Sequence, residues 1–103
     1  MNMRHNPEII AELRRRLLGL QQNNVVVALK TGTEVEDMDF AEIALMREVS
    51  RDNGRNFMPL VVKIGGPEAR RDIRDCLATG VDVILAPMVE TVYALTNFVE
   101  TAR

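Results

Sequence analysis

The stretch VVKIGGPEARRDI, residues 61–73, decides which fold the sequence predicts. Its first residues are apolar and mostly β-branched up to Lys63, without polar alternation, which is typical of a strand covered on both faces in a parallel sheet. Two glycines and Pro67 follow and begin a charged segment with helical spacing, since proline is well tolerated in the first turn of a helix. The stretch therefore predicts one βα unit.

The same cycle occurs before and after this stretch. The apolar run at residues 25–30 predicts an earlier strand that ends before Gly32, residues 58–64 contain the middle strand, and residues 81–88 predict a later one. Apolar residues at helical spacing follow each strand. The sequence thus predicts three successive βα units.

Specific residues mark the ends of the predicted helices. Asn53-Gly54 is expected to end the helix after the first strand and Gly80 the helix after the second, because glycine and asparagine tolerate the left-handed conformation at such ends. Thr91 is expected to cap the last helix. The residues of that helix predicted to point inward are Val92, Leu95, Phe98 and Val99.

An amphipathic helix precedes these units, with Asn6 as its cap and Pro7 at its first position. The predicted fold class is α/β, with a leading helix at residues 1–23 and three βα units at residues 24–103 in one domain. Right-handed crossovers would place the parallel strands side by side in the order of the chain.

The composition narrows the function classes. The 103 residues are 47% hydrophobic, enough for a single core, and the net charge of -2 gives no basic field for nucleic acid or an anionic membrane. No apolar run approaches the length of a membrane span, and a single cysteine, Cys76, has no disulfide partner and is expected in the core. A cytoplasmic protein is therefore expected.

Ionisable residues follow each predicted strand, and the carboxyl ends of parallel strands meet at one edge of a sheet, where ligands bind in such folds. The candidates are Glu34, Glu36 and Asp37 after the first strand, Lys63 with Gly65 and Gly66 after the second, and Glu90 after the third.

Each residue type suggests a role. Gly65 and Gly66 would let a ligand approach the backbone, the start of the following helix would favour an anion, and Lys63 would add a positive charge. Glu90, helped by the acidic segment, would supply oxygen ligands for Mg²⁺. An anion pocket beside a divalent cation suits chemistry through an enolate.

Simpler interpretations stand beside these. A Gly-Pro helix start is commonly only a turn, and Glu90 can be a favourable charge in the first turn of a helix. The single histidine, His5, lies near the terminus and is not expected to act as a base. Arg14, Arg15 and Arg16 are expected to form a solvated helix face.

The segment LVVKIGGPEARRDIRDCLATGVDVILAPMVETVYALTNFV, residues 60–99, resembles the HpcH/HpaI aldolase and citrate lyase β-chain family through its KIGG turn, Gly-Val-Asp strand start and APMVE motif. The resemblance extends over residues 25–98. It implies a (β/α)₈ barrel of the phosphoenolpyruvate and pyruvate type that uses Mg²⁺ or a similar ion to stabilise an enolate while a carbon–carbon bond is cleaved or formed.

The resemblance also implies roles for residues. Glu90 matches the family's glutamate metal ligand, and residues 34–37 match an acidic motif that organises metal-bound water or the catalytic base, which makes Glu34, Glu36 and Lys63 the catalytic candidates. Lys63 stands where many relatives carry a substrate-binding arginine, and lysine lacks the bidentate fork of arginine.

Length is a second departure, because a closed barrel of this kind takes about 250 residues. The family's aspartate metal ligand would follow the next strand, so the chain is expected to represent the amino-terminal part of such a barrel.

Two functions from different classes follow from this. The first is a metal-dependent carbon–carbon lyase or aldolase relative that acts on a 2-oxo acid or acyl-thioester-like substrate and is expected to be inactive alone. The alternative is a non-catalytic α/β module that works by oligomerisation or partner binding. In both cases we expect a homo-oligomer, because three strands leave unpaired edges.

Overall fold

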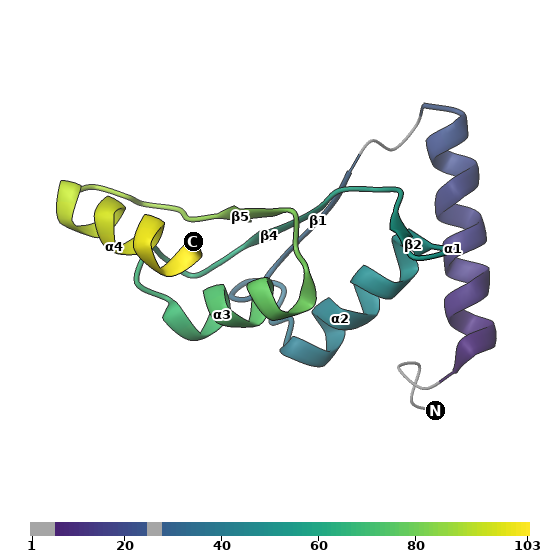
Figure 1. The fold of residues 1–103 in the computed structure, drawn as a ribbon, viewed down its shortest axis with the longest axis horizontal. Coiled ribbons are helices and arrows are strands. Elements are labelled where there is room, and N and C mark those ends of the chain that lie inside the picture. Colours follow the sequence, from purple (N-terminus) through teal and green to yellow (C-terminus); the bar gives the residue numbers. More distant parts are fainter. Residues whose placement is uncertain (1–5, 25–27) are drawn as a thin grey trace.

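The computed structural model of the protein describes residues 6–24 and 28–103, and these residues form a mixed α/β fold (Figure 1). The elements in chain order are α1 (Pro7–Gln22), β1 (Leu29–Gly32), α2 (Phe40–Val49), β2 (Arg51–Asp52), β3 (Arg55–Asn56), β4 (Leu60–Lys63), α3 (Arg70–Thr79), β5 (Val83–Leu85) and α4 (Val92–Ala102). The predicted α/β class and the leading helix are confirmed.

The main sheet has three parallel strands in the order β1-β4-β5, which follows the chain as predicted. Leu29 pairs with Leu60, and Val62 pairs with Ile84. The first strand differs from its prediction, because residues 25–27 lie outside the described residues and the strand continues through Gly32.

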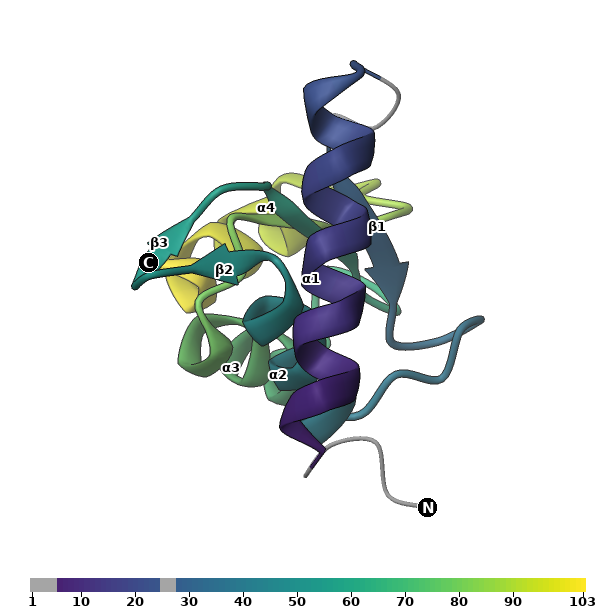
Figure 2. The same ribbon diagram turned by 90° about the vertical axis from the view of Figure 1, so that its right-hand side faces the viewer.

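Helices cover only one face of this sheet. In Figure 1 the helices α2 and α3 lie below the strands, and α1 stands beside the sheet, where Figure 2 shows it in front of the other elements. The core between these layers consists of Ile43, Leu60, Val62, Ile64, Ile73 and Cys76.

The opposite face of the sheet is open. Val83 and Leu85 of β5 remain 47% and 42% exposed, because side chains alternate between the faces along a strand. The prediction of strands covered on both faces was wrong, although Cys76 is in the core as expected. In strands of three or four residues, an unbroken apolar run does not reveal whether helices cover both faces of the sheet or only one.

Several helix ends agree with the sequence. The Asn6 side chain accepts hydrogen bonds from the N–H groups of Glu8 and Ile9 at 3.0 and 3.2 Å, and Thr91 Oγ1 accepts one from Ala94 N–H at 3.0 Å. Gly80 ends α3 in the left-handed conformation. No helix among residues 6–24 and 28–103 is both long and apolar enough to cross a membrane.

Asn53 and Gly54 form a hairpin turn and not the predicted end of a helix. Helix α2 ends earlier, at Val49, and Asn53 and Gly54, with φ of 50° and 76°, form the turn between the antiparallel strands β2 and β3. Two consecutive residues with positive φ are the requirement of a tight hairpin turn, so the same residue pair fits both a helix stop and a hairpin.

The inward face predicted for α4 was mostly wrong. Phe98 is half-buried and packs against the core, but Val92, Leu95 and Val99 are 81%, 49% and 42% exposed. Helix α4 packs mainly against α3 and is the last helix of its layer. The apolar residues of α4 therefore outnumber the positions at which a described neighbour covers the helix.

One buried arginine joins four segments beneath the sheet. The side chain of Arg47 is 3% exposed, and its Nη1 donates to Asp82 Oδ2 at 2.7 Å and to the Gly80 carbonyl at 2.9 Å. Its Nη2 donates to Ser50 Oγ at 2.8 Å and to the Met58 carbonyl at 2.9 Å. Helix α2 is thereby tied to the end of α3, to the start of β5 and to the segment before β4.

We expect this network to make stability depend on pH. Partial burial raises the pKa of Asp82, but the hydrogen bond from Leu60 N–H and the bond and charge of Arg47 outweigh it, so the pKa lies below the ordinary 3.8. A carboxyl whose folded pKa is lowered stabilises the fold above its unfolded pKa and loses this effect as the pH falls through the folded pKa.

Urea unfolding of the parent and of Asp82→Asn at several pH values tests this. The difference in free energy of unfolding should be full at about pH 6 and shrink below about pH 4. A difference that stays constant down to about pH 2 would contradict the role of the ionised carboxylate.

Candidate functional site

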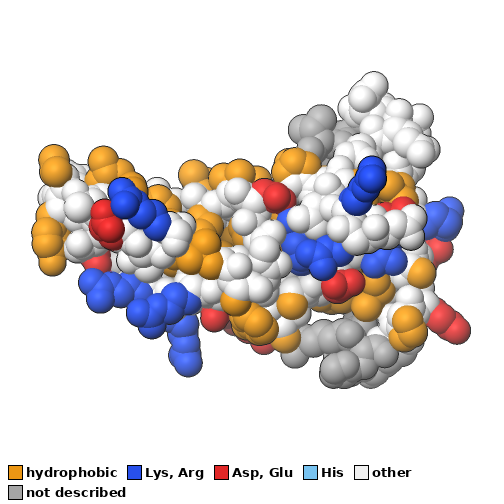
Figure 3. All heavy atoms as spheres, in the orientation of Figure 1, with side chains coloured by type: hydrophobic (Ala, Val, Ile, Leu, Met, Phe, Trp, Pro, Cys, Tyr) orange, Lys and Arg blue, Asp and Glu red, His pale blue; other side chains and the backbone are white. Residues whose placement is uncertain are grey.

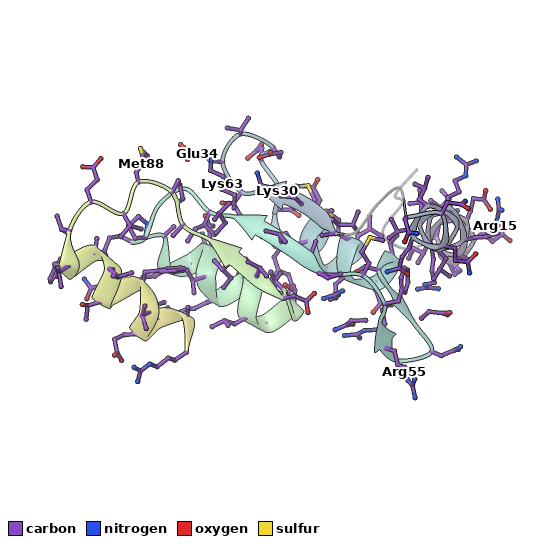
Figure 4. The ribbon with its side chains drawn as sticks, turned by 90° about the horizontal axis from the view of Figure 1, so that it is seen from above. Arg15, Lys30, Glu34, Arg55, Lys63 and Met88 are labelled. Atoms are coloured by element: carbon purple, nitrogen blue, oxygen red, sulfur yellow. The ribbon has the colours of Figure 1, made fainter. Side chains whose placement is uncertain are left out.

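A recess of about 280 Å³ lies at the carboxyl ends of β1 and β4 and beside the segment that follows β5. Figure 4 looks onto the sheet from its uncovered side and shows Lys30, Lys63, Glu34 and Met88 gathered in this region. The lining residues are Lys30, Glu34, Val35, Glu36, Lys63, Ile64, Pro87 and Met88. All three strands thus contribute, directly or through the segment that follows, as predicted for a parallel sheet.

Two lysines enter the recess from neighbouring strands. The register pairs Gly32 with Lys63, and Lys30 lies two residues before Gly32, so both lysines are on the uncovered face. They are the only lysines in the sequence. Sequence reasoning missed Lys30. Residues two positions apart on a strand lie on the same face, so Lys30 could have been placed beside Lys63 only after Gly32 was known to pair with Lys63.

Glycines make room for the two carboxylates. A Cβ at Gly65 would lie 3.2 Å from Glu34 Oε2, and one at Gly32 would collide with the Glu36 carboxylate. Neither glycine has a positive φ, so a side chain at either position would be compatible with the backbone conformation. The obstacle would be its contact with the glutamate carboxylate. At Gly66 an added Cβ would meet nothing within 4 Å.

The charged groups of the recess are available to a ligand. The side chains of Lys30, Glu34, Glu36 and Lys63 make no ion pair or hydrogen bond with any residue of the described ranges. All four are exposed. Two positive and two negative charges therefore offer contacts to an anion and to a cation without first breaking a bond within the protein.

The predicted anion site at the start of the helix takes a different form. Helix α3 begins at Arg70 and not at Pro67, because a turn intervenes in which Ala69 N–H donates to the Gly66 carbonyl at 3.2 Å. The dipole of α3 is thereby moved away from Gly65 and Gly66. The lysine side chains, and not the helix, supply the positive charge nearest the recess.

Glu90 is not part of the recess lining. It lies in the segment between β5 and α4, is exposed, and has no hydrogen-bond or ion-pair partner within the described residues. In the part of the chain that the structure describes, no three histidine, cysteine, aspartate or glutamate side chains are placed together to hold a metal ion. Glu34 and Glu36 both line the recess, and Glu90 does not.

Two further recesses have fewer charged side chains available to a ligand. One of about 330 Å³ lies between α1 and α2 and is lined mostly by leucines, with Arg16 at its side. The other, of about 410 Å³, includes Asp72 and Asp75, but Asp72 Oδ2 already accepts a hydrogen bond from Thr33 Oγ1 at 2.7 Å. The lysine-containing recess is therefore the candidate site.

Comparison with known proteins adds no family assignment: no protein-family model, no curated protein and no solved structure matches the chain. The resemblance to the HpcH/HpaI family stays a prediction that rests on the quoted motifs.

Proposed function

We propose that the chain is a relative of the metal-dependent carbon–carbon lyases and aldolases and that its recess binds a small 2-oxo acid or an acyl-thioester-like substrate. The observation that carries the proposal is that Lys63, Glu34 and Glu36, chosen from sequence, line one recess at the carboxyl edge of a parallel sheet. This edge is where ligands bind in folds built from βα units.

A partial (β/α)₈ barrel is the finer fold that we propose. Strands that follow the chain in parallel order, with helices on one face only, are what a barrel wall requires. The uncovered face, with Val83, Leu85 and the two lysines, would then be the barrel interior.

The lysines give the recess its preference for a carboxylate. Lys30 and Lys63 come from adjacent strands on one face, so a single small anion can contact both. Each ammonium contributes a compact charge with three rotatable donors, so two lysines can supply two separate contacts to a carboxylate in place of one bidentate fork. The apolar side chains of Ile64, Pro87 and Met88 would contact the carbon atoms of the substrate.

The recess offers only two carboxylates, a number that is sufficient for one divalent cation. Mg²⁺ usually takes one or two protein carboxylates and completes its shell with water and substrate oxygens, and the recess offers Glu34 and Glu36. We propose these two as the holding carboxylates, with Glu90 as the further ligand that the resemblance implies. The ion would supply stabilisation of negative charge on an enolate oxygen.

A ligand-observed NMR titration with pyruvate, in the absence and presence of Mg²⁺, tests the site. We expect dissociation in the millimolar range, about -4 kcal/mol, because few fixed groups contact the ligand. Lys63→Met should weaken binding about tenfold by removing one charge while keeping the length of the side chain.

Carboxylate variants separate the ion from the anion contact. Glu34→Gln and Glu90→Gln should each remove the Mg²⁺-dependent part of pyruvate binding, and Glu100→Gln on the exposed surface of α4 is the matched control. Unchanged binding in Glu90→Gln would make Glu90 a charge at the start of a helix only. No pyruvate binding to the parent chain would refute the proposed function.

A second candidate is an oligomerisation module, and the uncovered apolar face of the sheet favours it. Exposed apolar edge strands pair readily with other strands. Self-association without any response to Mg²⁺ or pyruvate would support this second candidate over the first.

A further inference from the structure

The recess of about 410 Å³ is separate from the lysine-containing recess, with which it shares no lining residue. It lies between the start of α2 and the first turns of α3, two helices that pack against each other. In Figure 3, both basic and acidic side chains are visible along the lower edge of the molecule, where Figure 1 shows α3. The residues that line the recess include Thr33, Met38, Phe40, Arg71, Asp72 and Asp75.

Two oppositely charged side chains of this recess have no partner among the described residues. The side chains of Arg71 and Asp75 make no ion pair or hydrogen bond with any residue of the described ranges, although they are four positions apart on α3. Opposite charges at this spacing are neighbours on a helix, but the order with the cation first is the less favourable one for pairing. Both charges thus remain available to a ligand, one helical turn apart.

A second carboxylate of the recess is held in place by its own hydrogen bond. Asp72 Oδ2 accepts a hydrogen bond from Thr33 Oγ1 at 2.7 Å, which joins the first turn of α3 to the segment after β1. The other carboxylate oxygen, Asp72 Oδ1, accepts none from a described residue and can still contact a ligand. Asp39, by contrast, caps α2, because its Oδ1 accepts a hydrogen bond from Glu42 N–H at 2.8 Å. The recess therefore offers two carboxylates and one guanidinium.

The wall formed by the start of α2 is apolar. Ile43 is 1% exposed and Met38 packs against the core, whereas Phe40 is 48% exposed. A hydrocarbon group of a ligand would remove part of the Phe40 ring from water, which favours binding. The volume suits a small ligand, because pockets for small molecules commonly begin at about 300 Å³.

We propose that this recess binds a free α-amino acid with an apolar side chain. The ammonium group of the ligand would contact Asp72 and Asp75, its carboxylate would contact Arg71, and its side chain would lie against the apolar wall. An α-amino acid carries both charged groups on one carbon atom, which matches opposite charges one helical turn apart. Because Asp39 also lines the recess, carboxylates outnumber the single guanidinium, and the ammonium should contribute more to affinity than the carboxylate.

A ligand-observed NMR titration of the full chain with L-leucine tests the site, together with two analogues that each lack one charged group. Isoamylamine lacks the carboxylate, and isocaproate lacks the ammonium. We expect leucine to bind with a dissociation constant in the millimolar range and isoamylamine to bind about fivefold more weakly, as for the loss of one exposed ion pair. Isocaproate should show no detectable binding, because the excess of carboxylates repels it.

Two substitutions remove the proposed contacts in the protein. Arg71→Gln and Asp75→Asn should each weaken leucine binding about fivefold. The matched controls are Arg74→Gln, at an exposed position of α3 outside the recess, and Asp52→Asn, at a partly buried position of β2. Neither control should change leucine binding, and circular dichroism checks that each variant remains folded.

Several outcomes would overturn the proposal. The first is a parent chain that does not bind leucine, and the second is isocaproate binding as strong as that of leucine, because the aspartates would then have no role. Equal effects of Arg71→Gln and Arg74→Gln, or of the two aspartate substitutions, would also overturn it, because the contacts would not be specific to the recess. Lys63→Met should leave leucine binding unchanged, and a loss there would place leucine in the lysine-containing recess instead.

Discussion

Replacing Arg47 by methionine is expected to lower the free energy of unfolding by about 3 kcal/mol. The side chain is 3% exposed and donates four hydrogen bonds, to Asp82, Gly80, Ser50 and Met58. Methionine fills a similar volume but donates nothing, so two backbone carbonyls lose a donor and a carboxylate loses its counter-charge. Asp82 is 38% exposed and can be rehydrated, which keeps the effect below the upper range for buried ion pairs.

Urea unfolding followed by circular dichroism measures this effect, with Arg51→Met as the matched control. Arg51 pairs with Glu48 at 3.8 Å and its Nε donates a hydrogen bond to Asn56 Oδ1 at 3.0 Å. These groups are exposed, so the loss of Arg51 should change the free energy of unfolding by less than about 1 kcal/mol. Equal effects of the two substitutions would show that the Arg47 network is not a major source of stability.

The double variant Arg47→Met/Asp82→Asn separates the ion pair from the other contacts. If the pair matters, the second substitution should cost less in the Arg47→Met background than in the parent, because the carboxylate has already lost its partner. Strictly additive effects would assign the loss to the carbonyl and hydroxyl contacts instead.

Ile73→Ala is expected to lower the free energy of unfolding by about 2–5 kcal/mol. Ile73 is fully buried on α3 and belongs to the cluster between the helices and β4. Removing three carbon atoms there loses their transfer free energy and leaves a cavity that the strand and helix backbones can close only partly.

Leu77→Ala, one turn further along the same helix, is the control because Leu77 is 45% exposed. Its expected effect in the same urea experiment is below about 1 kcal/mol, since much of the side chain already contacts water. A large effect at Leu77 would indicate that this side of α3 is covered in solution, for example by a second copy.

The sequence predicted what local patterns encode. Three apolar runs, each followed by helical spacing, were enough for the parallel order β1-β4-β5, and Asn6, Gly80 and Thr91 marked helix ends correctly. Each of these features depends on residues within a few positions of one another.

Features that depend on distant neighbours were missed. The Arg47 and Asp82 side chains are 35 positions apart in sequence and meet only because α2 packs against α3, whose end lies next to Asp82. Lys30 became a site residue through its register with a strand about thirty residues away, and the exposure of Val92 reflects the lack of a neighbour beyond α4. No pattern in a single segment contains this information.

The arrangement of elements has a consequence for how the molecule opens. Within the sheet β1 contacts β4 and β4 contacts β5, and among the helices each contacts the next along the chain, so each layer is a linear series of neighbours. In such a series the outer members have one partner where the inner members have two. Amide hydrogens of α1 and α4 should therefore exchange with solvent sooner than those of β4, because the chain can open from either end while its centre remains folded.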